Sequence, residues 1–150
     1  MATKATKIVL GKRPESFKKE VHCTMLDGST GCMEIEYKYR SRTELAALTD
    51  EMQAKLKDEA NAEIERFNAA VEQAKQSGAP IPEFTMTQSE IVNRQSAVAV
   101  QYIQAIALGW NLDAGFDREG VAELVDTLPA MADAIKDDYR AAINEGRLGN

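Results

Sequence analysis

The residues that could do chemistry in this chain are few and scattered. His22 is the single histidine, and Cys23 and Cys32 are the two cysteines. A thiol nucleophile needs its base within hydrogen-bond reach, but neighbouring residues of a strand point to opposite faces, which separates His22 from Cys23. A structural zinc site takes four ligands, for which this sequence offers too few candidates. The sequence therefore predicts no catalytic set, no metal site and no cofactor.

An acidic stretch between residues 111 and 117 invites comparison with a calcium-binding loop. An EF-hand loop that began at Asn111 would need Gly at its sixth position and Glu at its twelfth, where this chain has Phe116 and Ala122. A turn followed by a helix cap at Asp117 explains the stretch better. Because the other carboxylates are neighbours on polar helix faces, we expect a protein that is not an enzyme.

Alternating side chains predict a β-hairpin over residues 16–41. One apolar face carries Phe17, Val21, Cys23 and Met25 on the first strand and Met33, Ile35, Tyr37 and Tyr39 on the second, around a turn at residues 27–31. Keeping these faces together would pair Met25 with Met33 and Cys23 with Ile35. Cys32 then lies on the opposite face from Cys23, so we expect two free thiols.

The period becomes helical after Ser41, which has capping-box spacing to Glu44. Apolar residues recur in steps of three or four over residues 42–77, at Leu45, Leu48, Met52, Leu56, Ala60, Ile64, Phe67, Val71 and Ala74. A helix of this length spans about 52 Å, whereas a compact chain of this size is roughly 40 Å across. The helix should therefore protrude, bend or pack against another subunit, and we expect self-association or an elongated monomer.

Three further helices follow in the pattern. One opens at the Thr87 capping box and ends before Gly109, one is capped by Asp117, and one begins at Pro129 and ends at Gly146. The fold class is therefore α+β, an N-terminal antiparallel β-hairpin followed by a mainly α-helical body of about four helices. We expect a single domain over 1–150, with a mobile arm (1–15), the hairpin (16–41) and the helical body (42–150).

Charge and hydropathy limit the kinds of partner that the chain is expected to bind. The chain has 18 basic and 24 acidic residues, and the excess of acidic residues is located after residue 42. An acidic body repels phosphate, so nucleic-acid binding is not expected of it. The basic arm, together with the hairpin residues Lys18, Lys19, Lys38 and Arg40, leaves that alternative open. No apolar run approaches the roughly 18 residues of a membrane-spanning helix, and no signal-peptide core is present. We expect no membrane partner.

Two groups of apolar residues are candidates for binding a protein partner. The first is Trp110 with Phe116, in a glycine-containing loop that is either a local plug over helix ends or an exposed anchor. The second is the later part of the long helical stripe, formed by Leu56, Ile64, Phe67 and Val71. This stripe is either part of the core or an interface for a partner. The helix is longer than a compact chain of this size is wide, so an interface remains an alternative.

The order of several motifs extends over nearly the whole chain. These are Gly11-Lys12-Arg13-Pro14, Phe17, the Asp27-Gly28 turn, the run from Glu34 to Glu44, Gly109-Trp110 with Leu112-Asp113, and Tyr139 followed by Gly146-Arg147-Leu148-Gly149-Asn150. In this order they resemble the phage tail assembly chaperone family. The resemblance implies a non-catalytic protein of a tailed phage or prophage that holds the tape measure protein and helps recruit tail tube subunits. It also implies action in the host cytoplasm and exclusion from the mature virion. The alternative is a small regulatory nucleic-acid-binding protein that uses the basic arm and the hairpin.

Overall fold

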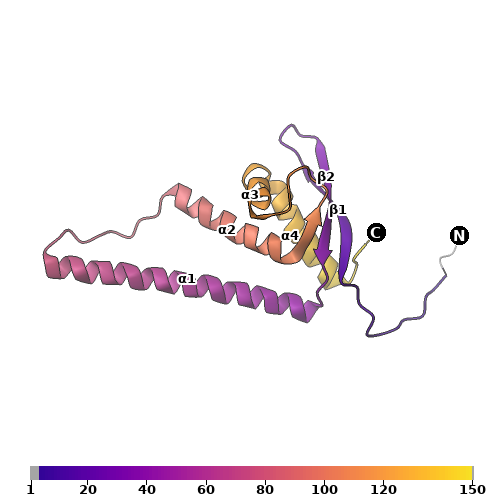
Figure 1. Ribbon diagram of the computed structural model, residues 1–150, viewed down its shortest axis with the longest axis horizontal. Coiled ribbons are helices and arrows are strands. Elements are labelled where there is room, and N and C mark those ends of the chain that lie inside the picture. The colour runs from indigo at the N-terminus through magenta and orange to yellow at the C-terminus, as the bar shows by residue number, and fades with distance from the viewer. Residues whose placement is uncertain (1–3, 150) are drawn as a thin grey trace.

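A computed structural model describes residues 4–149, which form three strands and four helices. In chain order the elements are β1 (Ser16–Thr24), β2 (Thr30–Lys38), α1 (Arg42–Ser77), α2 (Gln88–Ile106), β3 (Ala107–Trp110), α3 (Arg118–Thr127) and α4 (Pro129–Glu145). The sheet is antiparallel with order β1-β2-β3, and the helices lie on one side of it (Figure 1). The predicted α+β class, a hairpin followed by four helices, is confirmed. None of the helices in the described range combines the length and hydrophobicity needed to cross a bilayer.

The predicted pairing of the hairpin is wrong by an even number of residues. Cys23 opposes Gly31 rather than Ile35, and Met33 opposes Val21 rather than Met25. The turn is shorter than predicted, because the Met25 amide donates to the Ser29 carbonyl at 2.7 Å and Gly28 adopts a φ of 84°. A Cβ at Gly31 would clash with the Met25 side chain, which folds over it.

The even shift preserves the predicted faces of the hairpin. A slip by one residue would exchange the two faces, whereas a slip by two or four does not. Cys23 is therefore half-buried against the core while Cys32 is exposed on the other face, and both thiols are free. The predicted absence of a disulfide between them agrees with this geometry.

An aromatic cluster joins the sheet to α4. The Tyr37 ring lies 5.3 Å from Phe17 and 5.1 Å from Tyr139, centroid to centroid. The Tyr37 hydroxyl donates to the Ile135 carbonyl at 3.2 Å, and the Tyr139 hydroxyl donates to the Lys38 carbonyl at 2.9 Å. Because both hydroxyls have partners, two tyrosines can be buried at the centre of the core without an unsatisfied polar group.

The third strand was not predicted from the sequence. The sequence predicts a helix end and a turn over residues 107–110, but Trp110 opposes Ile35 and Gly109 opposes Glu36. Four residues are too few for an alternating pattern to stand out, and the pairing partner lies far away in the sequence. The side-chain oxygen of Asn111 also accepts from the Glu34 amide at 2.9 Å, which fixes the end of this strand.

The helix ends follow their local signals. Ser41 and Thr87 each form a complete capping box, and Asp117 accepts from the Gly120 amide at 2.8 Å. Gly78 and Gly146 take the left-handed conformation that ends α1 and α4, with φ values of 72° and 69°. These interactions lie within one turn of each helix end, so the sequence alone could predict them.

The 36 residues of α1 extend well beyond the rest of the molecule. Figure 1 shows α1 running away from the sheet, with α2 returning antiparallel beside it and the connector, residues 78–87, bridging their far ends. Of the three outcomes expected for the long helix, which were protrusion, bending or packing against another subunit, the structure shows protrusion. The predicted arm, residues 1–15, begins outside the described residues, and near its end Arg13 binds Glu44 at 2.5 Å and lies over the Tyr39 ring.

Candidate functional site

The apolar stripe of α1 is covered at its two ends and least covered in its middle. Leu45 is buried and Leu48 is half-buried, and both contact the core of the molecule. Further along, Ala74 is the one other α1 residue that is buried in the described structure. The sequence pattern predicts an amphipathic helix with one covered face, but Leu56, Ala60 and Ile64 in the middle of that face are exposed.

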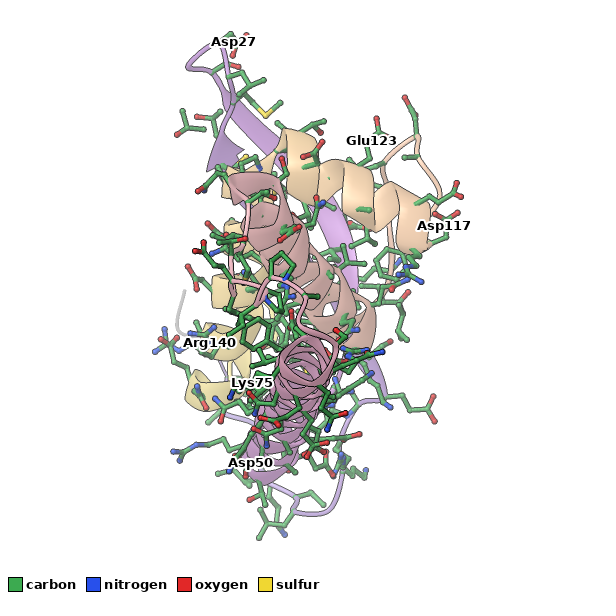
Figure 2. The ribbon with its side chains drawn as sticks, turned by 90° about the vertical axis from the view of Figure 1, so that its left-hand side faces the viewer. Asp27, Asp50, Lys75, Asp117, Glu123 and Arg140 are labelled. Atoms are coloured by element: carbon green, nitrogen blue, oxygen red, sulfur yellow. The ribbon has the colours of Figure 1, made fainter. Side chains whose placement is uncertain are left out.

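A groove lies between α1 and α2. We define the α1–α2 groove by the residues that line it, which on α1 are Thr49, Met52, Gln53, Leu56, Glu59, Ala60 and Glu63, on α2 are Arg94, Gln95, Ala97, Val98, Ala99, Gln101 and Tyr102, and on α4 are Lys136 and Arg140. The groove consists of two adjoining cavities, and Leu56 and Val98 line both of them. Figure 2 looks along α1 from its C-terminal end and shows Arg140 beside this helix. Its lining combines apolar side chains such as Met52, Leu56 and Val98 with charged ones such as Glu59, Lys136 and Arg140.

An ion pair closes one end of the groove. Arg94 of α2 binds Glu63 of α1, and this hydrogen bond lowers the pKa of Glu63 and raises that of Arg94. The pair is exposed to solvent, so its contribution to stability is small. Its position shows that the start of α2 lies beside the middle of α1.

The connector, not α2, accompanies the last turns of α1. Phe84 packs edge to face on Phe67, with ring centroids 5.3 Å apart and planes at 79°. Phe84 remains 54% exposed and Ile64 52% exposed, while Val71 is half-buried. We call Leu56, Ile64, Phe67, Val71, Ile81 and Phe84 the distal apolar surface. Monomeric proteins seldom leave so many large apolar side chains together on one projection, which makes this surface the best candidate for a partner.

The loop after β3 is organised differently. Trp110 and Phe116 pack on each other with ring centroids 5.0 Å apart and planes at 83°, and the Trp110 indole donates to the Ala114 carbonyl at 2.7 Å. Both rings are half-buried and contact the core. This internal packing supports the plug interpretation over the exposed anchor.

The six residues predicted to bind a partner thus fall into two separate groups. Leu56, Ile64, Phe67 and Val71 share α1, whereas Trp110 and Phe116 lie at the sheet. Sequence reasoning missed Ile81 and Phe84. The signal was present, because these are large apolar residues in a proline-containing segment that no helix or strand explains.

Three of the four hairpin residues named in the nucleic-acid alternative have side-chain partners within the protein. Lys19 binds Asp138 at 2.7 Å, and Lys18 lies 3.9 Å from Glu34. Arg40 donates to the Tyr139 hydroxyl at 3.2 Å. No observation in the described structure favours a phosphate-binding surface built from these side chains.

Potential metal ligands meet at one place in the described structure. Glu20, His22 and Cys32 lie together on the exposed face of the hairpin, opposite the core. Sequence reasoning had compared His22 with Cys23, its neighbour in the chain, and not with Cys32, its partner across the strands.

A family-wide comparison agrees with the motif order in the sequence. A model of the family described as "phage tail assembly chaperone" matches residues 1–150. Neither a curated protein nor a solved structure matches the chain. The family match covers the hairpin, α1 and the remaining helices together, so α1 is included in the family pattern. This chain belongs to the phage tail assembly chaperone family.

Proposed function

We propose that this protein is a non-catalytic chaperone that binds the tape measure protein of its phage through the α1–α2 groove and the distal apolar surface. The observation that carries the proposal is the incompletely covered apolar stripe of α1 from Leu56 to Val71, in which Ile64 is 52% exposed, on a helix that projects from the core. A tape measure protein is expected to be long and rich in helix. Such a client would present apolar stripes that match this surface in helix-in-groove fashion.

The energetics suit a reversible holding interaction. Full burial of one large aliphatic or aromatic side chain contributes about 1.5–3 kcal/mol, and residues already half-buried contribute about half of that. Ile64 and Phe84 together would then add a few kcal/mol before the cost of association is subtracted. This range supports binding that is specific but can be released when the tail tube assembles.

Charge on the same helix supports solubility. α1 carries five basic and eight acidic residues, which lie between and around its apolar positions. Like charge on the exposed faces opposes aggregation of the uncovered stripe. We further infer recruitment of tail tube subunits, self-association, action in the host cytoplasm and exclusion from the mature virion.

Co-expression with a tape measure fragment from the same phage tests the proposal. The wild-type chain should raise the soluble yield of the fragment and co-purify with it. Ile64→Asn and Phe84→Asn should abolish this gain, whereas Leu26→Asn should not, because Leu26 is 89% exposed at the hairpin tip, far from the groove. All three positions are solvent-exposed, so circular dichroism should show folded proteins.

Trp110→Ala separates the loop from the helix. If the loop is a plug, this variant loses stability and client binding together. A folded Trp110→Ala protein that no longer binds the client would instead make the loop an anchor. Failure of the wild-type chain to solubilise any fragment of the correct partner would refute the proposed function.

A further inference from the structure

The exposed face of the hairpin brings together residues that are distant in the sequence pattern. The observed register pairs His22 with Cys32 and, one step along the same face, Glu20 with Glu34. Hydrogen bonds at both ends of the ladder join odd-numbered pairs, Met25 to Ser29 and Tyr39 to Glu15. The even-numbered pairs therefore occupy the non-hydrogen-bonded positions, where facing side chains approach most closely.

The side-chain atoms of this face converge. One ligand atom from each of Glu20, His22 and Cys32 lies within 4.8 Å of the other two. The Nε2 atom of His22 is 3.1 Å from a carboxylate oxygen of Glu20, and these two side chains are 55% and 58% exposed. An ion in solution can therefore reach all three groups without any opening of the fold.

We propose that Glu20, His22 and Cys32 form a binding site for Zn²⁺. Carboxylate oxygen, imidazole nitrogen and thiolate sulfur are the three donor types that zinc uses in proteins. Tetrahedral zinc, with bonds of about 2.0–2.3 Å, places its ligands roughly 3.3–3.8 Å apart. The present separations of the three atoms are at most 4.8 Å, so the largest of them must shorten by about 1 Å. Exposed side chains achieve this by small changes of rotamer.

The donor set selects for zinc over the hard cations. Calcium and magnesium take oxygen ligands almost entirely, and an imidazole with a thiol would be poor ligands for either. Zinc binds Cys32 as the thiolate, so the thiol proton passes to solvent as the sulfur–zinc bond forms, and binding strengthens as pH rises.

Charges on the same face favour a bound cation. Glu20 lies directly across from Glu34, a like-charged pair that destabilises the hairpin, and the nearest cation to Glu34 is Lys18 at 3.9 Å. A divalent ion between the strands would offset this repulsion. With three protein ligands the fourth position is left to water or to the Glu34 carboxylate, which lies on the same face as Cys32.

Cobalt spectroscopy of the full-length, reduced protein tests the site. Co²⁺ should bind at one equivalent and give the intense absorption of a thiolate–cobalt bond, and one equivalent of Zn²⁺ should displace it. Cys32→Ser should lose this absorption. Cys23→Ser is the matched control, because it removes the other thiol from the opposite face and should leave the spectrum unchanged.

Affinity and stability give independent readouts. His22→Gln should weaken Zn²⁺ binding by calorimetry at least about tenfold, since loss of even an outer-sphere partner costs that much at protein zinc sites. Zn²⁺ should raise the thermal midpoint of the wild type and of Cys23→Ser, but not of Cys32→Ser.

Two results would overturn the zinc site. The first is the lack of stoichiometric Co²⁺ or Zn²⁺ binding by the wild type at neutral pH. The second is equal affinity in Cys32→Ser and the wild type, which would mean that surface carboxylates alone hold the ion. Neither result depends on whether the tape measure protein is bound.

Discussion

Phe67→Ala should loosen the end of α1 while leaving the core folded. Phe67 is half-buried, and its observed aromatic partner is Phe84 of the connector. An edge-to-face pair contributes about 1 kcal/mol, and partial burial of the ring contributes about 1 kcal/mol more. Alanine is the better helix former by roughly 0.5 kcal/mol, which offsets part of the loss. The net cost is about 1.5 kcal/mol, or roughly a tenfold rise in the open population of the last turns.

Hydrogen exchange measured by mass spectrometry can follow this opening segment by segment. In the wild type, amides of residues 64–77 should exchange much faster than those of α4, because few tertiary contacts hold them. Phe67→Ala should accelerate exchange of residues 64–77 about tenfold. The global free energy of unfolding should fall by no more than the net cost of about 1.5 kcal/mol.

Leu45→Ala provides the comparison within the same helix. Leu45 is buried in the main core, so its truncation should cost about 2–5 kcal/mol in urea unfolding. The reasoning is refuted if residues 64–77 are as protected as α4 in the wild type and Phe67→Ala destabilises the protein as much as Leu45→Ala. The end of α1 would then be part of the core and not a surface held ready for a partner.

Two further predictions concern titration and thiol reactivity. Burial, followed by the nearby charge and hydrogen bond of Asp138, raises the pKa of Tyr37, so above about pH 10 the unfolded chain releases this proton first and stability falls. Urea unfolding across that range should show a shallower alkaline decline for Tyr37→Phe, together with a loss of about 1 kcal/mol at neutral pH; an equally steep decline would contradict the assignment. In the folded protein a thiol reagent should modify exposed Cys32 quickly and half-buried Cys23 slowly, and both should react in denaturant without reductant. Finding neither thiol free would overturn the hairpin geometry.

Elements whose signals are local were predicted well from the sequence. The bounds of α1 follow from the Ser41 capping box and from Gly78, and α4 begins at Pro129, as its fixed φ favours. The two faces of the hairpin follow from a period of two residues. In each case the decisive interaction joins residues within about one turn or one alternation, so no knowledge of the rest of the fold is needed.

The candidate partner surface was predicted only in part. The stripe through Leu56 and Ile64 is visible in the sequence, but a helical stripe looks the same whether a neighbouring element covers it or not. The structure shows it uncovered because α2 stops beside the middle of α1 and the connector supplies only partial cover through Phe84. The spacing of apolar residues determines which face of a helix is hydrophobic, and only tertiary packing decides what that face contacts.

Contacts between distant segments were decided by the tertiary structure alone. The hairpin register depends on a turn closed by Met25 and Ser29, and a change of two or four residues leaves the alternating pattern untouched. That same register places His22 opposite Cys32, which the sequence order gives no reason to pair. The sequence by itself thus determined which residues share an apolar face, because the local period places them on the same side of a strand or helix. Only the tertiary structure decided which residue each of them contacts, because strand pairing and turn geometry join residues that are too far apart in the sequence for a local pattern to predict.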